Sequence, residues 1–458
     1  MSVVQQSSGL AAQTVWPVDR IKDHVWKIGS GITPSGGAAS YLDAGIPLLR
    51  SQNVHFDGLR LDDVAYIAAE THEEMSGTKL RPRDVLLNIT GASIGRCAFV
   101  PDGFGEGNVN QHVCIIRPAA KLNYKFLTYC LSAPWGQDQI FSSFTGASRQ
   151  GLGQRDLGEI QVPLPPLPEQ QRIAAYLDVS CAAIDAAVAV KRRQLETLDA
   201  LRKETITRAI TRGLTPNART KPSVQDWLGE IPAHWSALCL KRLLREPLTY
   251  GLNEAAELED RDLPRYLRIT DFDDDGNLRE DAFRSLPVEI AREALLEPND
   301  VLFARSGATV GKTFMFRNYE GKACFAGYLI RARTLLWKLD PLFLYLFTKS
   351  TAYEAWKNLI FTQATIQNIS AAKYNYLVIP LPPLGEQRAI VAHVEQRSAE
   401  FRSLTACIET QIATLTAYRK SLIHECVTGQ RRISEADVPR AEARASRAAA
   451  IDHDRLCP

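Results

Sequence analysis

The feature that most constrains the fold is an internal repeat with a period of more than 200 residues. Residues 164–170 read LPPLPEQ and residues 381–387 read LPPLGEQ, 217 positions later. The match continues without a gap to Thr211 in the first copy and Thr428 in the second. A period this long excludes a solenoid of short repeats. It indicates two copies of a unit that is large enough to enclose its own core.

Two further pairs of segments lie upstream in the same order. Residues 81–96 (RPRDVLLNITGASIGR) align with 297–312 (EPNDVLFARSGATVGK) at an offset of 216. Residues 48–58 (LLRSQNVHFDG) align with 266–276 (YLRITDFDDDG) at an offset of 218. The nearly constant offset predicts one globular unit followed by one helical unit, and then the same pair again.

The globular units are predicted to be α+β. Short apolar runs such as DVLLNIT and DVLFARS are bounded by Gly or Pro, which is typical of buried strands. Residues 124–134 and 341–350 are expected to add helices.

Each helical unit follows a proline-rich lead-in and carries apolar residues at alternating spacings of four and three. Such a heptad-like stripe is typical of helices that pack along their length. The first stripe is Leu177, Cys181, Ile184, Val188, Leu195 and Leu198; the second is Val394, Phe401, Ile408, Ile412, Leu415, Leu422 and Cys426. Polar residues interrupt both stripes. We expect the two helices to pack on each other; the alternative is that each packs only on its own globular unit.

The composition narrows the class of protein. Lys and Arg number 54 and Asp and Glu 52, a formal net charge of +2, which excludes a polybasic protein but not a local basic groove. The nine cysteines form no C-x-x-C pattern, so we expect no structural zinc site and a reduced, cytoplasmic chain. Residues 1–15 do not resemble a signal peptide, and we expect no membrane span.

One segment resembles a nucleotide-binding loop. Residues 306–313 (SGATVGKT) approach the P-loop pattern, but Ser306 stands where its first Gly belongs. The other copy, TGASIGRC at 90–97, has Arg and Cys in place of Lys-Thr. A tight turn in both copies is the preferred interpretation, and whether it presents Arg96 and Lys312 to phosphate or base edges stays open. A P-loop ATPase is a remote alternative. No methyltransferase motif or other catalytic constellation is found.

The duplicated segments LPPLPEQQRI and LPPLGEQRAI, together with WLGEIPAHW at 227–235, resemble the specificity subunits of type I restriction–modification systems. The resemblance covers about residues 15–430. It implies an α+β fold with two similar globular target recognition domains, separated by two long helices that pair as an antiparallel coiled coil. The implied segments are 1–163 (first recognition domain), 164–214 (first helical spacer), 215–229 (linker), 230–380 (second recognition domain), 381–430 (second helical spacer) and 431–458 (largely disordered tail).

The resemblance also implies a non-catalytic role in reading a bipartite, asymmetric site on double-stranded DNA. The implied partners are two copies of a DNA methyltransferase subunit, and ATP-dependent restriction or translocase subunits. S-adenosylmethionine, ATP and Mg are expected in those partners, with no cofactor or metal in this chain and no membrane association. A methylation-only system and an anti-phage scaffold remain as alternatives.

Base reading needs polar side chains on loops next to glycine, where the backbone can approach the duplex. Candidates in the first domain are Arg50, Ser51, Gln52, Asn53, Thr90, Ser93, Arg96, Gln111, Arg149 and Gln150. Candidates in the second are Arg268, Thr270, Arg305, Ser306, Thr309, Lys312, Gln363, Thr365, Gln367 and Asn368. Arg50 and Arg268 are alternatively internal salt-bridge residues. The glycine-rich opening at 27–37 has no evident counterpart in the second copy, which questions the equivalence of these two loops.

Overall fold

The computed structural model describes residues 14–144, 151–255, 257–273, 276, 278–307, 309–362 and 368–445. The chain divides into two compact units, of which unit 1 comprises residues 1–192 and 410–458, and unit 2 residues 193–409. Both boundaries fall inside long helices. Each unit therefore consists of one globular domain and one part of each long helix.

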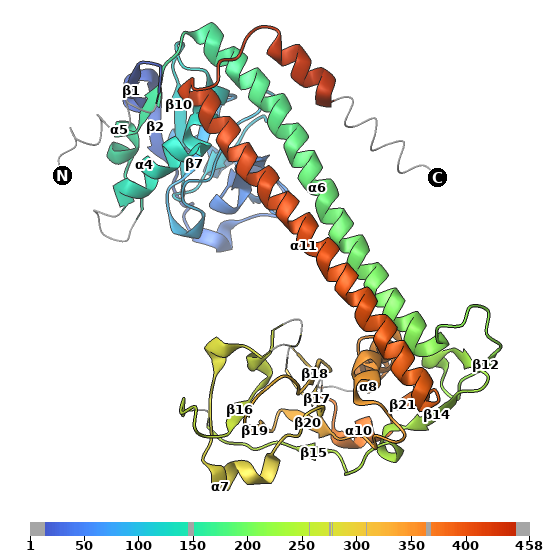
Figure 1. Cartoon of the computed structure of the whole chain (residues 1–458). Helices are drawn as coiled ribbons and strands as arrows, with labels where there is room; N and C mark the ends of the chain where they lie inside the picture. The colour runs from blue at the N-terminus through green and yellow to red at the C-terminus, as the bar shows by residue number, and fades with distance from the viewer. Residues whose placement is uncertain are drawn as a thin grey trace. The chain divides into compact units, whose positions relative to one another are not determined.

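The domain of unit 1 is built on a four-stranded antiparallel sheet in the order β2-β10-β7-β8, of which Figure 1 labels β2, β10 and β7. Its strands are β2 (Val25–Ser30), β10 (Val113–Pro118), β7 (Val85–Asn88) and β8 (Cys97–Phe99). The smaller sheets are β6 (Ala65–Ile67), β3 (Ile46–Leu49) and β9 (Asn108–Val109); β1 (Val18–Arg20) with β11 (Gln161–Pro163); and β4 (Val54–His55) with β5 (Gly58–Leu59). The helices are α2 (Ala69–Glu74), α3 (Tyr124–Ser132), α4 (Pro134–Phe144) and α5 (Gln154–Glu159).

The domain of unit 2 repeats this plan with a sheet in the order β15-β20-β17-β18. Its strands are β15 (Thr249–Tyr250), β20 (Leu329–Ala332), β17 (Val301–Ala304) and β18 (Thr313–Met315). The smaller sheets are β16 (Arg265–Leu267) with β19 (Ala323–Phe325), β14 (Ser236–Cys239) with β21 (Val378–Leu381), and β12 (Thr220–Pro222) with β13 (Glu230–Pro232). The helices are α7 (Val288–Ala291), α8 (Pro341–Phe347), α9 (Thr351–Thr362) and α10 (Ala371–Asn375).

Short 3-10 turns connect these elements. In unit 1 they are η1 (Ile21–His24), η2 (Gly37–Ser40), η3 (Ser51–Asn53), η4 (Ser76–Thr78) and η5 (Gly91–Ser93). In unit 2 they are η6 (Asp226–Leu228), η7 (Leu240–Arg242), η8 (Ile269–Asp271), η9 (Glu280–Ala282) and η10 (Arg292–Ala294).

The two central sheets share their register as well as their order. Leu87 pairs with Cys114 on one side and Cys97 on the other. Phe303, 216 residues later, pairs with the residues at the same offset, Ile330 and Thr313. All residues of β7 and β17 are buried, as the apolar runs at 85–87 and 301–304 predict for all but the polar Asn88. The predicted α+β fold and internal repeat are confirmed.

Two long helices, α6 (Leu167–Arg212) and α11 (Leu384–Thr428), complete both units (Figure 1). In unit 1, Leu177 and Ile184 of α6 share a core with Leu422 and Cys426 of α11. In unit 2 the shared core joins the residues of the opposite halves, Ile206 and Ile210 of α6 with Ile390 and Val394 of α11. The early half of each helix thus accompanies the late half of the other, so the helices run antiparallel.

The repeated Glu-Gln motif attaches each long helix to its own domain. Gln170 is fully buried; its Oε1 accepts from the backbone N of Asn123 (2.8 Å), and its Nε2 donates to the carbonyls of Lys121 (3.1 Å) and Pro165 (2.9 Å). Gln387 makes the same three bonds, to the N of Asp340 (2.8 Å) and the carbonyls of Lys338 (2.8 Å) and Pro382 (2.9 Å). Asn123 and Asp340 in turn cap α3 and α8.

Each long helix ends at a glycine in the left-handed region, Gly213 (φ 75°) or Gly429 (φ 77°), a common helix stop. A Cβ on Gly213 would lie 3.1 Å from the ring of Trp235, and one on Gly429 would overlap Trp16. Val15 N also donates to Thr428 O (3.0 Å). The start of each domain therefore packs on the end of a long helix.

The linker and the tail contain more structure than we expected. The linker region includes β12 and η6, where Leu228 is buried. The predicted disorder from residue 431 is wrong for residues 431–445, because Ile433 is buried in the core of unit 1 and the Arg432 guanidinium lies 4.2 Å from the Trp16 ring centroid. The remainder of the tail lies outside the described residues.

Helix α6 qualifies the expectation that the chain has no membrane span. It contains an 18-residue window of mean hydropathy 1.7, which by length and composition alone would allow it to cross a membrane, and 28% of that window is buried. Two carboxylates of this helix have partners within unit 1: Asp178 accepts from the Tyr129 hydroxyl (2.8 Å), and Asp185 pairs with Arg419 (3.0 Å). Packing in the core of unit 1 thus accounts for part of the apolar content of α6.

Two glycines that the sequence did not align occupy equivalent positions. Gly31 N donates to Val113 O (3.0 Å) and Gly251 N to Leu329 O (3.4 Å). A Cβ on Gly31 would overlap the carbonyl oxygen of Val109, and one on Gly251 that of Phe325. The two opening loops are therefore equivalent, at an offset of 220.

We expect Gly251→Ala to lower the free energy of unfolding by about 1–3 kcal/mol, because the added methyl group meets backbone that cannot move independently. Chemical denaturation of the full chain measures this effect. Gly103→Ala is the control, since a Cβ there meets nothing within 4 Å. Equal stability of the two variants would contradict the close approach at Gly251.

Candidate nucleic-acid interface

Loops from distant parts of the first domain meet at one end of its central sheet. Asn110 N donates to Leu49 O (3.0 Å), Ile89 N to His112 O (3.0 Å), and Leu152 N to Ile89 O (2.8 Å). These bonds place four segments side by side. Gly31 lies next to them, because its backbone is close to the carbonyl groups of Val109 and Asn110. We call this end the loop edge; in the first domain it comprises residues 30–33, 50–53, 88–96, 110–112 and 151–152.

The second domain builds the same loop edge with different side chains. Ala326 N donates to Leu267 O (2.9 Å), Arg305 N to Tyr328 O (3.0 Å), and Ile369 N to Arg305 O (2.9 Å). The loop edge of the second domain comprises residues 250–253, 268–271, 304–307, 309–312, 326–328 and 368–369. All described candidate residues of both domains lie on these loop edges, so the structure brings together what the sequence separates.

The candidates at 50–53 serve mainly to hold their own turn. Arg50 Nη2 donates to the carbonyl of Asp63 (3.1 Å). Asn53 is buried, and its Nδ2 donates to the carbonyls of Arg60 and Asp63 (both 2.9 Å), so in this conformation its amide cannot reach a base. Gln52 is exposed and donates to the Asp63 carboxylate. Ser51 contributes its carbonyl, which accepts from Asn88 Nδ2 (2.7 Å).

Two further candidates of the first domain, Thr90 and Gln111, belong to a chain of polar side chains along the loop edge. Thr90 Oγ1 lies 2.6 Å from His112 Nδ1, and Gln111 Nε2 lies 3.1 Å from His112 Nε2. Gln111 Oε1 accepts from the Thr33 hydroxyl. Donation by the Gln111 amide implies that His112 carries its proton on Nδ1. Ser93 Oγ accepts from Asn88 (3.2 Å), and Arg96 forms no ion pair within the described residues.

The candidate turn at 268–271 is also internally bonded. Arg268 Nη2 lies 2.7 Å from the fully buried carboxylate of Asp271 and donates to the carbonyl of Ala282 (3.0 Å). Arg268 and Asp271 correspond to Arg50 and Asn53, so the salt-bridge alternative for Arg268 fits the geometry. Thr270 is exposed beside this pair.

The turn between β17 and β18 carries four candidates, and Asn368 lies beside it. The Arg305 guanidinium lies 4.8 Å from the Tyr250 ring centroid. Ser306 forms a β-bridge with Asn368. Thr309 and Lys312 lie further along the turn, where Lys312 N donates to Thr309 O (2.9 Å). Arg149, Gln150, Gln363, Thr365 and Gln367 lie outside the described residues.

A partly buried lysine, Lys349, lies next to the end of the β17–β18 turn. Lys349 Nζ donates to the carbonyl of Thr313 (2.9 Å) and lies 4.6 Å from the Tyr345 ring centroid. Burial, and then the nearby positive charges of Arg202 and Lys312, lower the pKa of Lys349 to about 8. Two further cations, Arg202 and Lys312, thus lie close enough to Lys349 to affect its charge.

The P-loop alternative is wrong. A P-loop opens a helix, so that helix N–H groups and a lysine hold phosphates. Here residues 306–307 and 309–312 lie between two antiparallel strands, and Thr313 is buried in β18. The first copy makes the same turn between β7 and β8.

Several residues of the loop edges escaped the sequence analysis. Tyr250 and Tyr328 are exposed on the second loop edge, and Thr33 on the first. Aligning Gly31 with Gly251 would have brought residues 30–33 and 250–253 into consideration.

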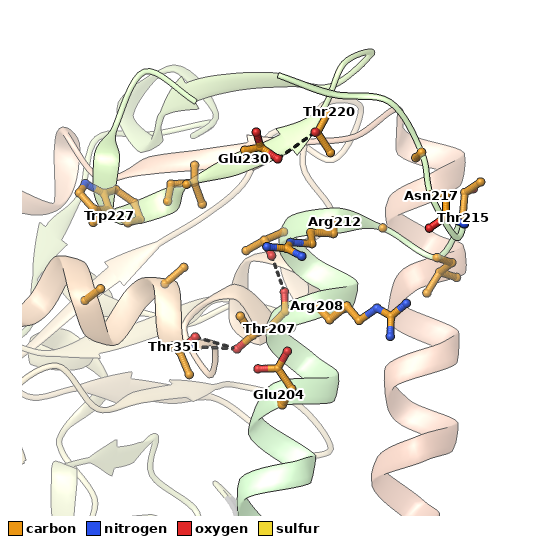
Figure 2. Close-up of a pocket in the computed structure, with 18 residues that line it drawn as sticks. Glu204, Thr207, Arg208, Arg212, Thr215, Asn217, Thr220, Trp227, Glu230 and Thr351 are labelled. Atoms are coloured by element: carbon orange, nitrogen blue, oxygen red, sulfur yellow. Dashed lines mark hydrogen bonds between the residues drawn. The ribbon is translucent and has the colours of Figure 1, made fainter. Parts of the chain in front are cut away.

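A cavity lies away from the loop edges, in unit 2. It measures about 760 Å³ and is lined by the last turns of α6, the linker and the start of α9. Figure 2 shows Arg208 and Arg212 on its α6 side and Thr220 bonded to Glu230 on its linker side. None of the candidate residues lines this cavity. No group of three or more His, Cys, Asp or Glu side chains suited to a metal occurs among the described residues.

Comparisons with known proteins agree with this geometry. The family model described as "Type I restriction modification DNA specificity domain" matches residues 46–196 and 284–413. The two matches span more than half of the chain and fall once on each half, so the chain belongs to this family.

Similar proteins are named as specificity subunits of type I restriction enzymes. The chain is 23% identical to the EcoBI type I restriction enzyme specificity subunit of Escherichia coli, over 89% of this chain and 85% of that protein. It is 24% identical to the EcoKI specificity subunit of Escherichia coli strain K12, over 86% and 84%. A solved structure of a type I restriction–modification system contains a chain with the same fold, at a TM-score of 0.68 and 18% identity, covering 90% of this chain and 97% of that one.

Proposed function

We propose that this chain is the non-catalytic subunit that selects the DNA sequence for a type I restriction–modification complex. Each domain contacts one half of an asymmetric, bipartite site through its loop edge. The observation that carries the proposal is the pair of loop edges, which have one backbone plan and different side chains. A homodimer would read a palindrome, whereas two diverged copies on one chain suit two different half-sites.

The partners follow from the same proposal. The chain docks two copies of a DNA methyltransferase subunit and the restriction or translocase subunits, in the cytoplasm where the DNA lies. S-adenosylmethionine, ATP and Mg belong to those partners, because base modification and translocation need chemistry that this chain is not proposed to supply.

Single-molecule sequencing of methylated adenines in the host, with and without this gene, tests the proposal. We expect one two-part motif with a fixed gap to be methylated only when the gene is present. Restoring the full-length gene should restore the motif. Unchanged methylation in the deletion strain, or a motif without a gap, would contradict the proposal.

A further inference from the structure

Arg305 occupies the centre of the second loop edge. Its backbone N donates to Tyr328 O (3.0 Å) and its carbonyl accepts from Ile369 N (2.9 Å). Two neighbouring segments thus fix its backbone on both sides. A side chain that starts from such a rigid position loses little further freedom when it binds.

The Arg305 side chain is stacked but not paired. Its guanidinium lies over Tyr250, and its Nε is buried without a hydrogen-bond partner. No carboxylate pairs with it in the described part of the chain, whereas Arg268 on the same loop edge pairs with Asp271. Aromatic stacking holds the planar guanidinium in place while its two terminal Nη groups remain available for a ligand.

The residues around Arg305 are suited to contact a DNA base, either a base that has left the stack or the edge of a base exposed in a groove. Tyr250 and Tyr328 are 43% and 64% exposed. Asn368 joins Ser306 by a β-bridge, and its Oδ1 is buried without a partner. Arg305 therefore lies next to a polar residue on an adjacent strand of backbone, beside two exposed aromatic rings.

The first domain lacks this arrangement. The equivalent position is occupied by Ile89, which makes the same two backbone hydrogen bonds as Arg305 but is buried. Ser30 replaces Tyr250 as the partner of the central strand, and His112 replaces Tyr328. The first domain therefore has no arginine at the position of Arg305. On its loop edge, the stacked arginine Arg50 lies over Tyr41 (5.7 Å) but pairs with Asp63 (3.4 Å).

We propose that Arg305, held on Tyr250, reads a guanine in the half-site contacted by the second domain. Arginine donates two parallel hydrogen bonds to O6 and N7 of guanine, a pattern that no other base offers in the major groove. The proposal deepens the function proposed above and rests on it.

The test measures methylation by the complex of the full-length chain with its methyltransferase subunits. Duplexes carry the motif found by sequencing, with each guanine of each half replaced in turn by the other bases. We expect the wild-type complex to favour one guanine by roughly 5- to 150-fold in kcat/KM. Arg305→Gln should reduce that preference to near one and leave the other half-site unchanged.

Arg305→Lys keeps the positive charge without the two-pronged geometry, so we expect it to lose the preference while retaining methylation. Arg261→Ala is the matched control, because Arg261 stacks on Phe283 (5.0 Å) but pairs with Glu280 (3.3 Å). It should keep the wild-type preference.

Four results would overturn the role of Arg305. They are an unchanged preference in Arg305→Gln, a uniform loss of activity on all duplexes in Arg305→Lys, a relaxed preference in the Arg261 control, and a motif with no guanine. A wild-type complex that methylates no two-part motif would contradict the proposed function itself.

Discussion

Gln387→Ala is expected to lower the free energy of unfolding by roughly 2–4 kcal/mol. The substitution leaves the backbone N of Asp340 and the carbonyls of Lys338 and Pro382 without partners, and each buried unpaired group costs about 1–3 kcal/mol. Partial entry of water reduces the sum. The loss also loosens the start of α11, because Gln387 joins that helix to the cap of α8.

Chemical denaturation of the full-length chain measures this effect. Gln170→Ala should destabilise unit 1 by a similar amount, since Gln170 makes the equivalent bonds. Gln154→Ala provides the control, because that side chain is exposed and makes one bond, of 3.2 Å, to Ser30. If the Gln387 and Gln154 variants unfold at the same denaturant concentration, the conserved geometry of the two copies does not reflect a shared stabilising role.

Lengthening both long helices by seven residues is expected to widen the gap between the half-sites by about three base pairs. Seven residues make about two helical turns and about 10.5 Å, against about 3.4 Å per base pair. The insertions belong after Arg192 in α6 and after Glu409 in α11, where each helix passes from one unit to the other. We propose that this helix pair sets the gap between the half-sites, and neither insertion touches a loop edge.

Sequencing of methylated adenines measures the altered motif. We expect both half-sites to be unchanged in sequence. Seven residues inserted between Pro216 and Asn217, in the linker outside the helices, form the control and should leave the gap as it was. An altered half-site after the helix insertion, or a gap that changes with the linker, would show that the helices do not act as the spacer.

Most of the fold could be predicted from the sequence, because the patterns that indicate it are periodic or repeated. The heptad-like stripe placed Leu177 and Ile184 of α6 in a core, and the structure buries both. The repeat predicted two equivalent sheets, and the register of Leu87 and Phe303 confirms them. Gly31 and Gly251 were missed because insertions shift their offset and because no local pattern reveals a backbone approach.

Less of the candidate nucleic-acid interface could be predicted from the sequence. A polar residue beside a glycine can complete a turn or remain available to a ligand, and only the tertiary hydrogen bonds distinguish the two. Asn53 completes its turn, whereas Arg305 stacks on a ring 55 positions away in the chain. Assignment of base contacts to the candidate residues stays a prediction.

The central claim is that the two domains are independent readers, and an exchange within the chain tests it most directly. Residues 16–163 are replaced by 235–380, which begin at the equivalent tryptophan and end at the equivalent proline. Methylation by the resulting chain with its partner subunits is then mapped by single-molecule sequencing. We predict a gapped motif in which both halves have the sequence previously read by the second domain. Retention of the original asymmetric motif would contradict the account.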